Sequence, residues 1–145
     1  MILPDVNVLV YAFRRGAPEH ERYTAWLTQV VGGAEELALH DLPLVGLVRI
    51  VTNPRILRSA APMSLALDFV QRLIDAPRAR WLSAGSRAWS QFASLAASDR
   101  SLGGNLTPDA YLASLALTHG CRLATADRGF ARFPGLDWFD PAVHD

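Results

Sequence analysis

Apolar residues fall into two patterns along this chain: short aliphatic runs, and longer segments in which they recur every three or four residues. The short runs are typical of buried strands, and the periodic segments are typical of helices with one apolar face. Strands are predicted at residues 2–10 with a break at Pro4-Asp5, and at 36–39, 79–82, 122–125 and 136–139. Helices are predicted at residues 19–31, 42–51, 64–75, 86–97 and 107–120.

Residues that favour helix ends support these boundaries. Asp41, Ser64 and Thr107 are placed to cap three of the helices at their start, and Gly120 ends the last one. Because strands and helices alternate, we predict an α/β fold with a central, mostly parallel sheet flanked by helices. The 145 residues contain no repeat or linker, so we expect one domain spanning residues 1–145.

The charged residues and the single cysteine exclude several classes of protein. Fourteen cationic side chains balance fourteen acidic ones, so any nucleic-acid site must be local. All the cations are arginine, and the absence of lysine excludes P-loop NTPases and Schiff-base enzymes. Cys121 alone cannot form an internal disulfide or a cysteine-rich zinc site. No apolar run reaches about 18 residues, so we expect a cytoplasmic protein that does not enter a membrane.

Three aspartates are candidates for a common site. Asp5 follows the first aliphatic residues and Asp127 follows the strand at 122–125, and open α/β sheets bind ligands beyond the carboxyl ends of their strands. Asp109 begins the helix at 107–120 and shares a face with the apolar residues that should contact the sheet. Each aspartate taken alone is also explained as a turn or helix-start residue.

Three inward carboxylates point to a divalent metal ion. A buried carboxylate is costly unless a cation meets it, and few cations are predicted to lie inside this fold. Mg²⁺ and Mn²⁺ prefer oxygen ligands, commonly one or two carboxylates together with water. Such an ion polarises a phosphoryl oxygen and lowers the pKa of a bound water, so the pattern indicates phosphoryl chemistry.

Five segments resemble, in order and spacing, those of PIN-domain ribonucleases, and in particular the VapC-type toxins of toxin–antitoxin pairs. They are DVNVL at 5–9, VRIVTNPR at 48–55, TPDAYLA at 107–113, LATADRGF at 123–130 and FARFPGL at 130–136. They are similar to the family's first aspartate segment, its "RxxTNPR" helix end, its "xDAxLAALA" helix, its "LxTxDxxF" turn and its C-terminal ending.

The resemblance implies a PIN-like domain whose acidic pocket binds Mg²⁺ or Mn²⁺ and cleaves RNA, often a tRNA or rRNA loop. Asp5, Asp109 and Asp127 would be three of the acids, and Asn7 and Thr125 would hold them or the metal-bound water. It also implies a homodimer and a VapB-type antitoxin whose C-terminal segment blocks the pocket.

The sequence departs from the family pattern at two positions. Gly46 stands three residues before Arg49, where the family usually has an acid, and Gly129 stands at a second position that is often acidic. Glycine has no ligand atoms, so we expect one well-held ion rather than two. Asp41 and Asp99 are poorly placed to substitute for the missing carboxylates.

Arginine and tryptophan side chains are candidates for contacts outside the acidic pocket. Arg49, Arg55 and Arg128 lie near the predicted site and could bind RNA phosphates, although each is also explained as a solvated surface residue. The four tryptophans occupy apolar positions, so we expect them in the core or in a dimer interface rather than stacked on bases. They are Trp26, Trp81, Trp89 and Trp138.

Two functions of other classes remain open. The glycines at positions 46 and 129 favour a catalytically impaired PIN-fold module that binds a protein, and such a module would not bind millimolar Mn²⁺. A phosphatase- or receiver-type aspartate pocket is a third reading, but those pockets rely on a lysine that this chain lacks.

Overall fold

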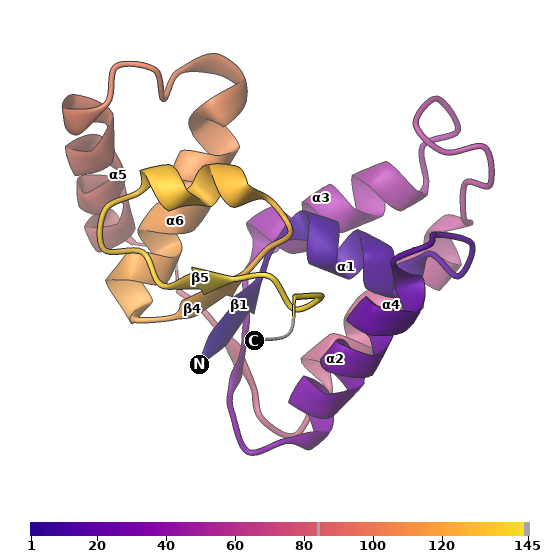
Figure 1. Ribbon diagram of the computed structural model, residues 1–145. Helices are drawn as coiled ribbons and strands as arrows, with labels where there is room; N and C mark the ends of the chain where they lie inside the picture. Colours follow the sequence, from indigo (N-terminus) through magenta and orange to yellow (C-terminus); the bar gives the residue numbers. More distant parts are fainter. Residues whose placement is uncertain (84, 144–145) are drawn as a thin grey trace.

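A five-stranded sheet forms the centre of the computed structural model, which describes residues 1–83 and 85–143 (Figure 1). Its strands are β1 (Ile2–Pro4), β2 (Leu37–Leu39), β3 (Ala79–Trp81), β4 (Arg122–Ala124) and β5 (Trp138–Phe139). They lie in the order β3-β2-β1-β4-β5 and every neighbouring pair is parallel, which confirms the predicted α/β fold. Because β1 and β4 are neighbours, the residues that follow them are brought together at the carboxyl edge of the sheet.

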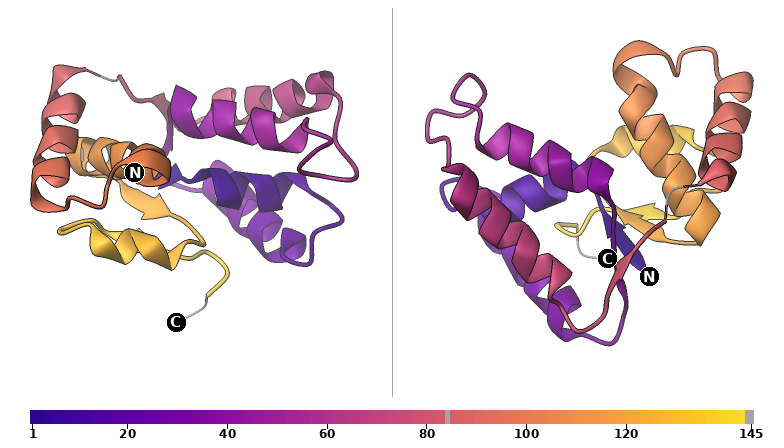
Figure 2. Two further views of the ribbon diagram at one scale, coloured as in Figure 1. Left: turned by 90° about the horizontal axis from the view of Figure 1, so that it is seen from above. Right: turned by 180° about the vertical axis from the view of Figure 1, so that it is seen from behind.

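Helices cover both faces of this sheet (Figure 2). Four of them, α1 to α4, lie on one side, and α5 and α6 lie on the other. The described helices are α1 (Val6–Phe13), α2 (His20–Gly32), α3 (Asp41–Val51), α4 (Met63–Ile74), α5 (Ser86–Ser98) and α6 (Thr107–His119), with short 3₁₀ helices η1 (Gly104–Leu106) and η2 (Arg128–Arg132). Within the described residues, none of the helices is long and apolar enough to cross a bilayer.

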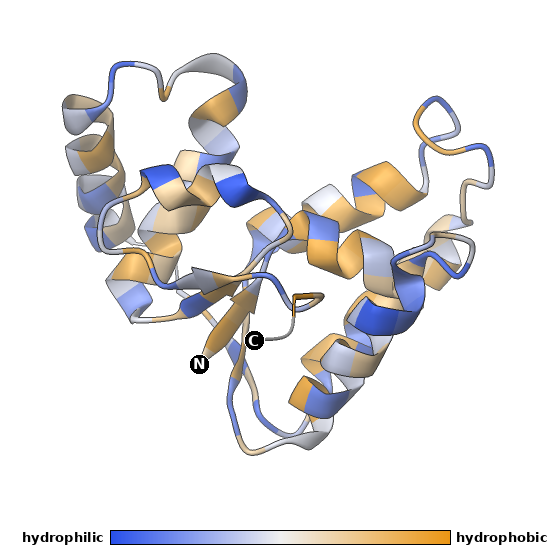
Figure 3. Cartoon of the chain, viewed as in Figure 1, coloured by the Kyte–Doolittle hydropathy of each residue, from blue (hydrophilic) through white to orange (hydrophobic). Residues whose placement is uncertain are grey.

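The strands divide the apolar core into two parts. Leu37 and Leu39 face the helices α1 to α4, whereas Ala38 faces α5 and α6, as the two-residue period of a strand requires. Leu3 and Leu123 are fully buried on the α5–α6 side. Their strands are apolar along most of their length (Figure 3), which is typical of a parallel sheet covered on both faces.

The prediction that residues 6–10 continue the first strand is wrong. The strand ends at Pro4, and the carboxylate of Asp5 caps helix α1 by accepting a hydrogen bond of 2.7 Å from the backbone N–H of Val6. The residues that follow favour strands by intrinsic preference, but α1 packs between α2 and α3 and buries them there, so tertiary packing decides their conformation.

Helix caps also differ from those predicted. His40, not Asp41, caps α3, because its Nδ1 accepts a hydrogen bond of 3.1 Å from the backbone N–H of Leu42. Ser64 lies inside the first turn of α4, and Thr107 lies inside the first turn of α6, and neither helix has a side-chain cap. Gly120 ends α6 in the left-handed conformation, as predicted.

Candidate active site

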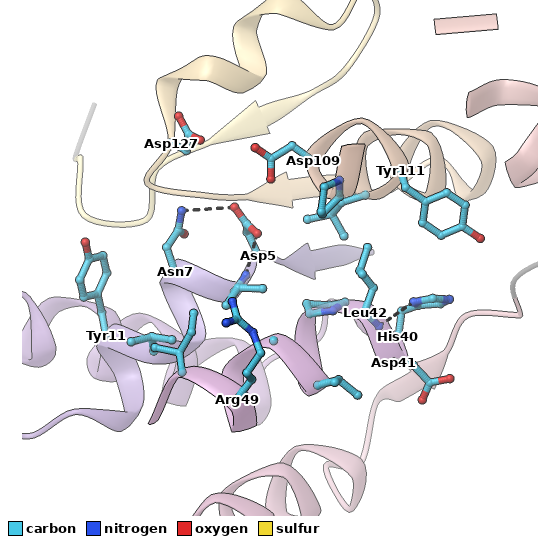
Figure 4. A pocket seen from close by; sticks show the side chains of 18 of the residues that line it. Asp5, Asn7, Tyr11, His40, Asp41, Leu42, Arg49, Asp109, Tyr111 and Asp127 are labelled. Carbon is cyan, nitrogen blue, oxygen red and sulfur yellow. Dashed lines mark hydrogen bonds between the residues drawn. The ribbon is translucent and has the colours of Figure 1, made fainter. Parts of the chain in front are cut away.

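The three predicted aspartates line one cavity at the carboxyl edge of the sheet. Asp5 follows β1, Asp127 comes shortly after β4, and Asp109 lies in the first turn of α6. All three contribute to a cavity of about 890 Å³, and Figure 4 shows their carboxylates grouped at one end of it. Asp5 is only 6% exposed, Asp109 is half-buried and Asp127 is exposed. The cavity therefore presents carboxylates from its floor to its rim.

Asp5 is fixed by hydrogen bonds to both of its carboxylate oxygens. Oδ1 accepts the helix-capping bond from Val6, and Oδ2 accepts a bond of 2.7 Å from the hydroxyl of Thr125. The side-chain amide of Asn7 donates a longer bond of 3.2 Å to the same Oδ2. Oδ2 thus accepts two bonds, whereas Oδ1 accepts one and still has a free lone pair for another partner. The network therefore orients Asp5 without using all of its capacity to bind a cation.

Thr125 links the ends of the two central strands. Its side chain is fully buried, and its oxygen accepts bonds from the backbone N–H of Asp127 at 3.0 Å and from the amide of Asn7 at 3.3 Å. Because its own proton goes to Asp5, the hydroxyl uses its donor and both acceptor positions. The carbonyl oxygen of the Asn7 side chain in turn accepts a bond of 3.1 Å from the backbone of Ala126. The predicted supporting residues thus lie directly behind the acids.

The carboxylates repel one another, and this is visible in their pKa values. Burial raises the pKa of Asp109 to about 6, and the negative charges of Asp5 and Asp127 add to the effect. Burial also raises the pKa of Asp5, although its hydrogen bonds to Thr125 and Val6 act in the opposite direction. No ion pair between described residues includes any of the three acids. The site therefore has negative charge that no described residue neutralises through an ion pair.

The three carboxylates can bind a divalent ion, but they do not enclose it. Uncompensated carboxylates in a part-buried cavity attract a cation, and Mg²⁺ or Mn²⁺ is held by one or two carboxylates with several waters. Across residues 1–83 and 85–143, however, no three acidic, histidine or cysteine side chains are arranged closely enough to enclose an ion. The arrangement thus suits an ion that keeps part of its water shell better than one enclosed by protein ligands.

Gly46 and Gly129 both border the acidic group, and close contacts explain why each is a glycine. A Cβ atom at position 46 would lie 2.9 Å from Cγ2 of Val6, so α3 approaches the start of α1 too closely for a side chain. At position 129, a Cβ atom would lie 2.9 Å from Oδ1 of Asp127, which accepts a bond of 2.8 Å from the Gly129 backbone N–H. Both glycines leave room for a neighbouring side chain.

Replacing Gly129 with alanine is expected to reduce activity about tenfold, because a displacement of about 1 Å in a reacting group is that costly or more. The new methyl group would press on Oδ1 of Asp127 and turn the carboxylate away from its present position. The control is Gly103→Ala, since a Cβ atom there has no neighbour within 4 Å. RNA cleavage rates of the two variants provide the measurement. Equal rates would show that the orientation of Asp127 does not matter.

The three predicted arginines are not placed alike. Arg49 lines the cavity from α3 beside the acids (Figure 4), and Arg14 lines it from the end of α1. Arg55 and Arg128 are exposed, and neither is among the residues that line this cavity. Sequence reasoning grouped them by proximity along the chain, which does not determine where long side chains end.

Sequence reasoning missed two residues that line the same cavity. His40 is buried directly after β2, and burial lowers its pKa. Tyr111 lies on α6 with its ring centroid 6.4 Å from that of His40. The position of His40 at the end of a predicted strand was an available signal, since it is the same signal that identified Asp5. Tyr111 follows Asp109 by two positions and had no separate signal.

Comparisons with known proteins agree with this fold and identify the family. A family model of the PIN domain matches residues 2–136. Ribonuclease VapC43 from Mycobacterium tuberculosis is 42% identical over 97% of this chain and 95% of its own length, and ribonuclease VapC33 from the same species is 34% identical over 97% and 98%. The solved structure of VapBC2 from Rickettsia felis, bound to a promoter DNA fragment, superposes with a TM-score of 0.69 at 19% identity, covering 97% of this chain and 98% of that one. The protein belongs to the PIN-domain family and, within it, to the VapC ribonucleases.

Proposed function

We propose that this protein is the toxin of a VapBC-type toxin–antitoxin pair and a metal-dependent endoribonuclease that hydrolyses phosphodiester bonds in RNA. The observation that carries the proposal is the group formed by Asp5, Asp109 and Asp127, which share one cavity and form no ion pair with any described residue. The relatives that are 30% to 42% identical over nearly the whole chain are named ribonucleases.

In this proposal the three aspartates hold one divalent ion, Mg²⁺ or Mn²⁺, partly through waters of its shell. Ribonucleases of the PIN-domain family generally use divalent ions. When bound, the ion supplies Lewis acidity toward a phosphoryl oxygen and lowers the pKa of water. Thr125 and Asn7 hold Asp5 in place for this role, as supporting residues do around metal ligands.

The remaining residues of the cavity suit the steps of hydrolysis. No hydrogen bond from another described residue fixes the carboxylate of Asp109, and its pKa of about 6 suits a group that accepts a proton from the attacking water near neutral pH. The water oxygen bonds to phosphorus as the P–O bond to the leaving nucleotide breaks, and the departing oxygen takes up a proton from solvent. Arg49 lies beside the acids and carries a guanidinium that matches the geometry of a phosphate.

We further propose a VapB-type antitoxin as the partner and a homodimer as the active form. The solved structures with this fold include the VapBC2 complex of Rickettsia felis and FitAB bound to a DNA fragment, which has a TM-score of 0.69 at 21% identity. An antitoxin segment with a cationic side chain would complement the unneutralised acids. We expect the protein to act in the cytoplasm, where its proposed RNA substrate lies.

The proposed function is tested with purified protein and total RNA. We expect discrete fragments with Mg²⁺ or Mn²⁺, none with EDTA, and recovery when excess metal is restored. Intact RNA under all conditions, with folded protein, would contradict the proposal and favour the catalytically impaired binding module. That alternative is not favoured at present, because the relatives are named ribonucleases and the three predicted acids, together with Asp41, line the cavity.

Metal binding is expected to weaken steeply as the pH falls from 7 to 5. A carboxylate must be ionised to bind a metal, and Asp109 becomes protonated around its raised pKa of about 6. An ordinary aspartate, with a pKa of 3.8, would stay ionised over this range. Calorimetric titration with Mn²⁺ across the range measures the effect. An affinity that does not change between pH 7 and pH 5 would show that Asp109 is not a ligand.

A further inference from the structure

Aromatic rings extend from the acidic cavity to the surface of α5. Tyr111 lines the cavity, and its ring centroid lies 5.2 Å from that of Trp89 and 5.9 Å from that of Phe92. Trp89 and Phe92 meet edge to face at 5.6 Å. The rings therefore connect the interior of the cavity with a tryptophan on a different helix.

The sequence predicted Trp89 in the core or in a dimer interface, and the structure shows that it is not part of the core. It is 59% exposed, while the buried positions of α5 are Ala88 and Leu95. Its contacts with Tyr111 and Phe92 hold the indole in position while leaving much of its surface free. A large, fixed and exposed aromatic surface beside a binding cavity is suited to stacking on a flat ligand group.

Two arginines at the same cavity suit the phosphates of a polyanion. Arg14 and Arg49 line it, and neither forms an ion pair with any described residue. Single-stranded nucleic acid is bound by this combination, in which cations follow the phosphates and aromatic side chains stack on bases. The apolar and cationic parts of the cavity thus match the two parts of a nucleotide.

We propose that Trp89, supported by Tyr111, is a stacking platform for a nucleobase of single-stranded RNA that flanks the phosphodiester cut at the acidic group. This proposal rests on the proposed ribonuclease function and adds a site outside the metal centre. Stacking accepts every base because each has a flat face, so the platform favours an unpaired nucleotide rather than a particular sequence. The enzyme would then select loops and single strands over duplexes.

The test measures RNA binding in EDTA, so that binding is separated from cleavage. The probe is a short fluorescein-labelled single-stranded oligoribonucleotide of mixed sequence, and the readout is fluorescence anisotropy. Trp89→Leu keeps an apolar side chain but removes the aromatic face, and it is expected to weaken binding about tenfold, the effect of losing one base stack. Trp89→Phe should retain part of the affinity. An oligomer of abasic ribose phosphates should bind wild type and Trp89→Leu equally.

Trp81→Leu is the matched control, because Trp81 is 50% exposed but neither lines the cavity nor contacts Tyr111. It should bind the oligoribonucleotide as the wild type does. Wild-type affinity in Trp89→Leu would overturn the platform while leaving metal-dependent RNA cleavage intact. A change from dimer to monomer in Trp89→Leu, detected by sedimentation, would also overturn it and assign Trp89 to an interface between copies. Failure of the wild type to bind the oligoribonucleotide in EDTA would also overturn the platform, whereas failure to cut RNA with Mg²⁺ or Mn²⁺ present would overturn the proposed function itself.

Discussion

Asp109→Asn is expected to lower RNA cleavage by a factor of about a thousand or more while the protein stays folded. Asparagine keeps the size of the side chain but removes a metal-binding charge and the proposed proton acceptor. The fold should gain stability at neutral pH. Protonation of Asp109 favours the folded state below its ordinary pKa of 3.8, and this contribution is lost as the pH rises through about 6. The neutral asparagine carries no half-buried charge, so the variant does not lose this part of the folding stability at pH 7.

The matched control for this variant is Asp68→Asn, an exposed aspartate on α4 that does not line the acidic cavity. Its cleavage rate and Mn²⁺ affinity should equal those of the wild type. Thermal unfolding establishes that both variants are folded. If Asp109→Asn cut RNA at the wild-type rate, the placement of the ion and of the proton acceptor would both be wrong.

Thr125→Val is expected to reduce both stability and metal affinity. Valine has nearly the same shape, but without the hydroxyl it leaves Oδ2 of Asp5 with one donor fewer and the backbone N–H of Asp127 without its acceptor. Loss of these buried bonds should cost about 1–3 kcal/mol, which lowers Tm by roughly 5 °C or more. Metal affinity should fall about 10- to 100-fold, as it does when other residues that hydrogen-bond to metal ligands are replaced.

The variant also has a pH signature that a general loss of stability would not produce. The hydrogen bond from Thr125 lowers the pKa of Asp5, so its removal should move the acidic limb of Mn²⁺ binding to higher pH. Thr28→Val is the control, because the hydroxyl of Thr28 is exposed and bonds only to a carbonyl within α2. Unchanged pH dependence in Thr125→Val would show that Thr125 supports the fold but does not tune the acid.

Local sequence patterns predicted the sheet more accurately than the start of the chain. The segment at 122–125 contains β4 because its apolar residues lie between turn signals and are covered by helices, whereas the segment at 79–82 contains the edge strand β3, in which Trp81 stays exposed. Residues 6–10 have equally strong strand preferences, yet they form α1. The residue that indicates a helix here is Asp5, because its carboxylate caps the start of α1. From the sequence alone an aspartate at this position is equally explained as a turn residue, so the helix start was not recognised.

The site residues that follow neighbouring strands could be predicted from the sequence. The residues whose long side chains enter the cavity from elsewhere could not. Asp5 and Asp127 follow strands, and parallel neighbours must bring such residues together. Whether Arg49 or Arg128 enters the cavity depends on the path of a long side chain, which spacing along the chain does not specify. The position of Trp89 beside Tyr111 depends on how α5 packs against α6, a contact between residues far apart in sequence.

The contact between Gly46 and Val6 has a consequence for how this site can change over evolutionary time. An acidic side chain at position 46 is blocked by the methyl groups of Val6 while valine stays at position 6. The two positions are therefore coupled: a side chain at position 46 is accommodated only if Val6 shifts or is replaced by a smaller residue, so the effect of either substitution depends on the other.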